Sequence, residues 1–149
     1  MKNQILFVIL SLISGALIPV QASTNAAFSK ITGNAISTAL VVFATGLLAV
    51  GAYALITRTP VPSIEQFKSA PVYGYAGGFI IAFYVILITI VVPRLGVGPA
   101  IGLIITGQIL SAVAIDHFGL FGVAVREMDL KRILGTLLMV AGIYFVMKK

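Results

Sequence analysis

The sequence predicts an all-α, polytopic membrane protein with five transmembrane helices, and two observations support this fold class. First, 60% of the 149 residues are hydrophobic and only 9% are charged, whereas about a quarter of a soluble domain is charged. Second, the apolar residues form five runs without internal charges, each near the roughly 20 residues that a helix needs to cross a bilayer core. A segment in lipid must satisfy its own backbone hydrogen bonds, so these runs are expected to be helices.

The five helices are expected to form a single transmembrane domain over residues 1–149. They lie at about residues 4–27, 34–57, 71–93, 97–115 and 131–147. The last is short, so Arg132 and Lys148 must extend from its ends toward the membrane surface. The first has an alternative interpretation, because Lys2, an apolar stretch and the small residues around Ala22 also follow the order of a cleavable secretory signal. More membrane helix follows directly, and we therefore interpret this segment as the first span.

The links between the spans differ in length and character. Residues 30–34 and 93–96 are short connections, whereas residues 58–71 contain three prolines that break a helix. Residues 118–131 begin with an apolar half, FGLFGVAV, and continue into a charged stretch, REMDLKR, whose last residue is Arg132. Eight residues are too few to cross a membrane as a helix. We therefore expect the apolar half to be an interfacial or re-entrant segment, and Asp129 to cap the last helix.

Basic residues favour the cytoplasmic side of a membrane, and here they are divided almost evenly. With five spans, the side of the N-terminus carries six of them: Lys2, Arg58, Lys68, Arg126, Lys131 and Arg132. The opposite side carries four: Lys30, Arg94, Lys148 and Lys149. This small difference predicts a cytoplasmic N-terminus, and it is also compatible with insertion in both orientations.

Polar side chains on the first span form one candidate wall of a substrate cavity. Ser14, Gln21 and Asn25 fall close to one line along a helix, since steps of seven and eleven residues nearly close whole turns. Pro19 removes an amide donor and crowds the carbonyl of Gly15, so the helix should bend there. The side chains either line a cavity or hold neighbouring helices together, and we favour the cavity for Gln21 and Asn25.

The third and fourth spans offer further candidates for solute binding. Gln108 is expected near mid-depth of the membrane, where an amide costs free energy unless it has a partner or water. Ser111 shares its helix face, and either cavity lining or packing accounts for both. Tyr84 follows a stripe with Tyr73 and Gly77. Close helix packing is the first interpretation of that stripe, and a ligand contact through Tyr84 is the second.

Asp116 and His117 come at the end of the fourth span. A carboxylate beside an imidazole can relay protons or act as a gate, and ionisable groups in membrane segments often mark transport paths. The alternative is structural, with both side chains capping the helix end or pairing with Arg126 of the following link. We favour the structural interpretation.

Other classes of function find little support in the composition. One histidine and no cysteine argue against a zinc site. Glu127 and Asp129 lie on an exposed link and do not form a convincing acid/base pair, and the sequence has no phosphate-binding loop. We expect neither an enzyme nor a bound cofactor or metal. The formal charge of +6 comes from residues that flank apolar runs, which indicates a lipid bilayer rather than a nucleic acid as partner.

Six short motifs carry a resemblance to a known family. They are Ser14-Gly15 with Pro19, Gln21 and Asn25; Gly77-Gly78 with Ala82-Phe83-Tyr84-Val85; Pro93-Arg94-Leu95-Gly96; Gly107-Gln108; Asp116-His117-Phe118-Gly119; and Arg132-Ile133-Leu134-Gly135. Over nearly its whole length the chain resembles the YdcZ family of inner-membrane exporters, in the drug/metabolite transporter superfamily. The resemblance implies an uncleaved first helix and a five-helix unit comparable to one half of a ten-helix transporter.

The resemblance also implies a way of working. The smaller relatives, the small multidrug resistance proteins, act as antiparallel dimers with a membrane glutamate on the first helix. This chain has Ser14, Gln21 and Asn25 there instead, which argues against simple proton exchange. We expect two copies, or one copy and a paralogue, to expose a cavity for a small organic solute alternately to each side. The alternative is a non-transporting membrane scaffold or accessory subunit of a partner membrane protein.

Overall fold

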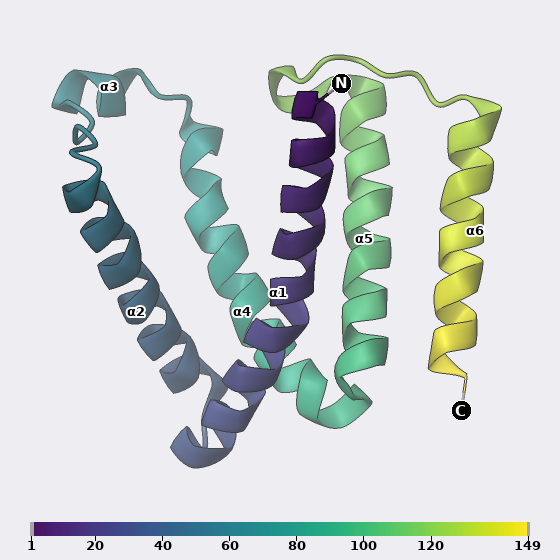
Figure 1. The fold of residues 1–149 in the computed structure, drawn as a ribbon, viewed down its shortest axis with the longest axis horizontal. Helices are drawn as coiled ribbons and strands as arrows, with labels where there is room; N and C mark the ends of the chain where they lie inside the picture. Colours follow the sequence, from purple (N-terminus) through teal and green to yellow (C-terminus); the bar gives the residue numbers. More distant parts are fainter. Residues whose placement is uncertain (1, 149) are drawn as a thin grey trace. The chain divides into compact units, whose positions relative to one another are not determined.

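The computed structural model describes residues 2–148, and every regular element in that range is helical. The five long helices are α1 (Lys2–Thr32), α2 (Ala35–Ile56), α4 (Ala76–Leu95), α5 (Val97–Phe118) and α6 (Leu130–Met147). Each contains a stretch long and apolar enough to cross a membrane, which confirms the expected all-α fold with five membrane-spanning helices (Figure 1). The chain divides between Arg94 and Leu95 into two compact units, which are described one at a time.

In the first unit, a tight polar turn joins α1 to α2. Helix α1 continues to Thr32, beyond the end expected near residue 27. It ends there because Gly33, which follows, has a φ of +69° that does not fit an α-helix. The Asn34 side chain then caps α2, since its Oδ1 accepts hydrogen bonds from the backbone N–H groups of Ile36 (2.7 Å) and Ser37 (3.3 Å). The turn is therefore closed by groups that the chain itself supplies.

Helix α1 is 31 residues long, which at about 1.5 Å per residue is well beyond the roughly 30 Å of a bilayer core. Pro19 lies inside it, and the axis of α1 changes direction part-way along (Figure 1). Residues 4–17 are exposed throughout, whereas Ala22, Asn25 and Ala26 are buried. Only the part of α1 that follows the proline packs within the protein.

The long link after α2 contains a short helix that the sequence did not predict, α3 (Ile64–Ser69). A capping box starts it, in which Ser63 and Gln66 satisfy each other's backbone N–H groups. A 3-10 turn, η1 (Val72–Tyr75), precedes α4, so regular α-helix begins at Ala76 rather than near residue 71. The first turn tightens because the N–H of Gly74 bonds to the carbonyl of Pro71 (2.8 Å), three residues back.

In the second unit, α5 and α6 form a hairpin. A Cβ atom added at Gly102 would lie 3.3 Å from Cγ2 of Ile143 on α6, so the absent side chain lets the two helices approach closely. Helix α5 ends at Gly119, whose φ of +60° is the left-handed conformation of a helix cap. A 3-10 turn, η2 (Leu120–Gly122), and an extended segment follow, and Asp129 caps α6 as expected, accepting from the N–H of Arg132 (2.8 Å).

Candidate functional site

The strongest site candidate in the first unit is Asn25 on α1. Its side chain is 5% exposed, and its Nδ2 atom is buried without a hydrogen-bond partner. A buried donor left unpaired costs about 1–3 kcal/mol, so such a group requires a reason. Ser14 and Gln21, expected on the same line, are exposed. The shared line therefore does not give the three side chains a shared environment, because burial on α1 begins only beyond Pro19.

A second unpaired polar atom of this unit belongs to Tyr84 on α4. The side chain is half-buried, and its hydroxyl oxygen is buried without a partner. Tyr84 precedes the buried face of α4, which consists of Val85, Ile88, Thr89 and Val92. Asn25 Nδ2 and the Tyr84 hydroxyl are both hydrogen-bond donors. The Asn25 nitrogen requires an acceptor oxygen or nitrogen, whereas the Tyr84 hydroxyl can also accept a hydrogen bond.

A small cavity that the sequence did not predict lies one turn beyond Asn25. It has a volume of about 250 Å³ and is lined by residues of three helices: Ser29, Ala35, Thr89, Ile90, Pro93 and Arg94. The Thr89 hydroxyl donates to the carbonyl of Val85 (2.7 Å), and Nη1 of Arg94 donates to the carbonyl of Ile90 (3.1 Å). Thr89 could have been found in the sequence as the single serine or threonine in its apolar run.

In the second unit, Gln108 and Ser111 lie on α5 and are both exposed. They belong to a different unit from Asn25 and Tyr84. Their exposure leaves them available to water, lipid or another helix, and their part in a solute site stays a prediction.

Asp116 and His117 belong to a polar cluster that joins the end of α5 to the start of α6. Nη2 of Arg132 lies 2.6 Å from Oδ2 of Asp116, in an ion pair that is about one-third exposed. Nη1 of the same arginine donates to the carbonyl of Arg126 (2.9 Å), whose own N–H donates to the carbonyl of Asp116 (2.8 Å). The N–H of Met128 donates to Nδ1 of His117 (3.3 Å). We call this set the α5–α6 clasp.

The clasp corrects one detail of the structural interpretation of Asp116. The carboxylate pairs with Arg132, and not with the Arg126 side chain. Arg126 is held at the end of α5 by its backbone. Arg132, in the first turn of α6, directs its two terminal guanidinium nitrogens, Nη1 and Nη2, into the cluster. A cavity of about 180 Å³ adjoins this end of the hairpin and is almost wholly apolar: Leu110, Val113, Ala114, Met128, Ile133, Thr136 and Leu137.

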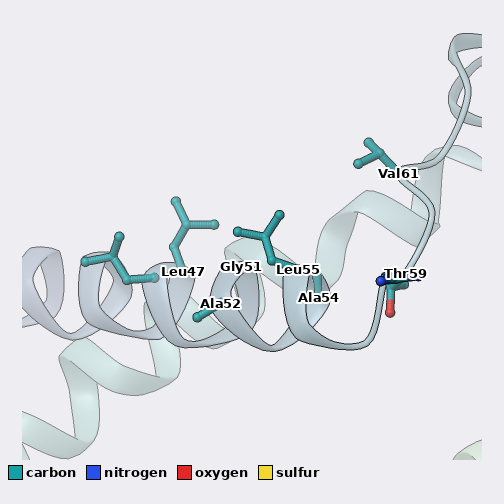
Figure 2. A pocket seen from close by; sticks show the side chains of 9 residues that line it. Leu47, Gly51, Ala52, Ala54, Leu55, Thr59 and Val61 are labelled. Carbon is teal, nitrogen blue, oxygen red and sulfur yellow. The ribbon is translucent and has the colours of Figure 1, made fainter.

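A larger groove of about 810 Å³ runs along α2 and contains none of the expected site residues (Figure 2). Its lining is apolar except at one end, where Arg58 and Thr59 lie. Among the described residues, no three or more His, Asp or Glu side chains gather in a way that could hold a metal ion.

Comparison with known proteins gives one match. The family model DMT_YdcZ, described as "Putative inner membrane exporter, YdcZ", matches residues 6–145. No curated protein and no solved structure matches the chain.

Proposed function

Since the chain belongs to the YdcZ family of inner-membrane exporters, we propose that it is one half of an alternating-access transporter for small organic solutes. The family is one of inner-membrane exporters rather than enzymes, and the five membrane-spanning helices agree with a membrane location. In this proposal the two units form a single membrane domain, and the solute contacts Asn25 first of all.

The observation that carries the proposal is the unpaired amide nitrogen of Asn25. In a chain embedded in lipid, a buried donor without a partner is disfavoured by about 1–3 kcal/mol, and a solute with an acceptor oxygen would remove that penalty on binding. The Tyr84 hydroxyl supports the same assignment, because it too is a buried donor without a partner. Ser14, Gln21, Gln108 and Ser111 are proposed as contacts that form when a second copy covers their exposed faces.

The working unit is proposed to be a dimer, either antiparallel or with a paralogue. Helix α6 has no buried residue, and most large apolar side chains of the described helices are exposed. These exposed faces are available to a second five-helix unit as well as to lipid. Two related five-helix units that rock against each other would open a central cavity to one side at a time.

The test is transport by purified protein in reconstituted vesicles, after a thermal-unfolding screen of small neutral and amphipathic solutes has identified one that binds. Asn25→Ala and Gln21→Ala should each reduce transport at least tenfold without lowering the amount of protein in the membrane, and Tyr84→Phe should reduce it several-fold. Thr24→Ala is the matched control, since Thr24 neighbours Asn25 but is exposed and donates to the carbonyl of Gln21. Unchanged transport by Asn25→Ala would remove Asn25 from the site.

The rival function is a non-transporting scaffold or accessory subunit. The exposed polar residues of α1 and α5 favour it, because such side chains also join membrane helices of different proteins. A scaffold should show no thermal stabilisation by any solute in the screen, whereas a transporter should be stabilised by its own.

A further inference from the structure

The groove along α2 has an apolar lining and one polar end. Gly51, Ala52 and Ala54 form a floor of small side chains. Leu47 lies toward one end of the groove and Leu55 toward the other (Figure 2), and Leu48 also lines it. Val61 borders the groove from the segment after the helix, which prolines 60 and 62 stiffen. The face of α2 is therefore hollowed at its small residues, between the larger side chains of the leucines and Val61.

The length of the groove matches the depth of one leaflet. Leu47 and Arg58 are 11 residues apart, which is about 16 Å along the helix axis at roughly 1.5 Å per residue. Half of a bilayer core is about 15 Å. The polar end of the groove lies just beyond the end of α2. If α2 spans the bilayer, this end is expected at the level of the phospholipid headgroups and the apolar end near the middle of the membrane.

The polar end is held in an unusual backbone conformation. Arg58 has a φ of +51°, a left-handed conformation that is uncommon for a residue other than glycine. Hydrogen bonds from the N–H of Arg58 to the carbonyl of Leu55 (3.2 Å) and from the N–H of Thr59 to the carbonyl of Ala54 (2.9 Å) hold it there. These two hydrogen bonds are those of a common helix C-terminal cap, in which the residue after the helix adopts the left-handed conformation. The turn places Arg58, a cation, at the polar end of the apolar groove.

We propose that this groove binds one anionic phospholipid, with an acyl chain along Leu47, Gly51 and Leu55 and the phosphate on Arg58. A guanidinium donates two parallel hydrogen bonds to a phosphate, and the described lining holds no acidic residue that would compete. A second copy of the chain fits the groove less well. Of the four acidic residues, Asp116 is paired with Arg132 and Asp129 caps α6, so a protein partner of this sequence offers few counter-charges. The inference does not depend on the transported solute.

The experiment measures lipid binding to the full-length protein in detergent by native mass spectrometry, with phosphatidylglycerol as the probe and phosphatidylcholine as the zwitterionic comparison. Phosphatidylglycerol should bind at least fivefold more tightly. Arg58→Gln should remove that preference, whereas Lys68→Gln, which removes the same charge from α3, should leave it unchanged.

A second pair of variants tests the groove itself. A Cβ atom at Gly51 or at Gly46 would meet no atom within 4 Å, so both glycines of α2 accept a larger side chain. Gly51 lines the groove and Gly46 does not. Gly51→Leu should weaken phosphatidylglycerol binding at least fivefold, and Gly46→Leu should change it less than twofold. Wild-type binding by either Arg58→Gln or Gly51→Leu would overturn the proposal. So would a change of oligomeric state in Gly51→Leu with lipid binding intact, which would mean that a second copy occupies the groove.

Discussion

Arg132 illustrates what a single residue contributes that its position in the sequence does not reveal. It follows a cluster of charges and begins the last span, where the sequence indicates only a long side chain reaching the membrane surface. In the structure it joins α6 to Asp116 and to the carbonyl of Arg126. The choice between Arg126 and Arg132 as partner of Asp116 depends on the path of the intervening link, which local sequence does not determine.

Replacing Arg132 tests this assignment. Arg132→Gln should lower the free energy of unfolding by about 1 kcal/mol, because a partly exposed ion pair contributes up to about 1 kcal/mol and the hydrogen bond to the Arg126 carbonyl adds to it. Arg126→Gln is the control and should change stability by less than about 0.5 kcal/mol, since Arg126 enters the clasp through its backbone. Denaturant unfolding in micelles measures both. A larger loss in Arg126→Gln than in Arg132→Gln would contradict the geometry.

Among the helices, the end of α5 shows how one glycine determines where an element stops. Gly119 combines a positive φ with close packing, since a Cβ atom there would lie 2.7 Å from Cγ2 of Val125. The chain can therefore turn back over the helix end and bring Arg126 to the carbonyl of Asp116. The clasp depends on this turn.

Gly119→Ala should accordingly destabilise the protein. We expect a loss of at least about 1–2 kcal/mol, the cost of a left-handed conformation for an L-residue, with the contact to Val125 added. Gly135→Ala is the matched control, because Gly135 lies within α6 and its added Cβ would meet no atom within 4 Å; it should be neutral or stabilising by up to about 1 kcal/mol. Thermal unfolding of both variants gives the comparison, and Val125→Ala should recover part of the loss in Gly119→Ala. Equal stability of the two glycine variants would be evidence against the cap.

At the scale of the whole molecule, the distribution of positive charge is the feature with the widest consequence. Six basic residues on one side against four on the other form a weak orientation signal. Most large apolar side chains face outward in the single chain, as expected for helices that meet lipid and a second unit. Both facts are compatible with a pair of chains inserted in opposite orientations.

Orientation can be measured with reporters fused to either terminus. If the chain works as an antiparallel homodimer, each terminus should be found on both sides of the membrane in comparable amounts. Adding two lysines to the link at residues 30–34 should then shift the population toward one orientation, whereas the same addition to residues 58–71 should shift it toward the other. A single orientation unaffected by either change would rule out the antiparallel homodimer and leave a pair with a partner protein, such as a paralogue, or a parallel assembly.

Composition and the length of the apolar runs alone determine that this chain has five membrane-spanning helices, because a long uncharged apolar run satisfies its backbone in lipid as a helix. Local rules also predicted a bend in α1, whose axis changes direction part-way along, and the cap at Asp129, since each acts within one turn of helix. The tertiary structure decided which members of a polar stripe are buried, and so separated Asn25 from Ser14 and Gln21. It also selected Arg132 for Asp116 and hollowed one face of α2. The burial of Asn25 and the pairing of Asp116 depend on contacts between different helices, about which helical spacing carries no information. The groove depends on the path of the chain after α2, because its lining runs from Leu47 to Val61.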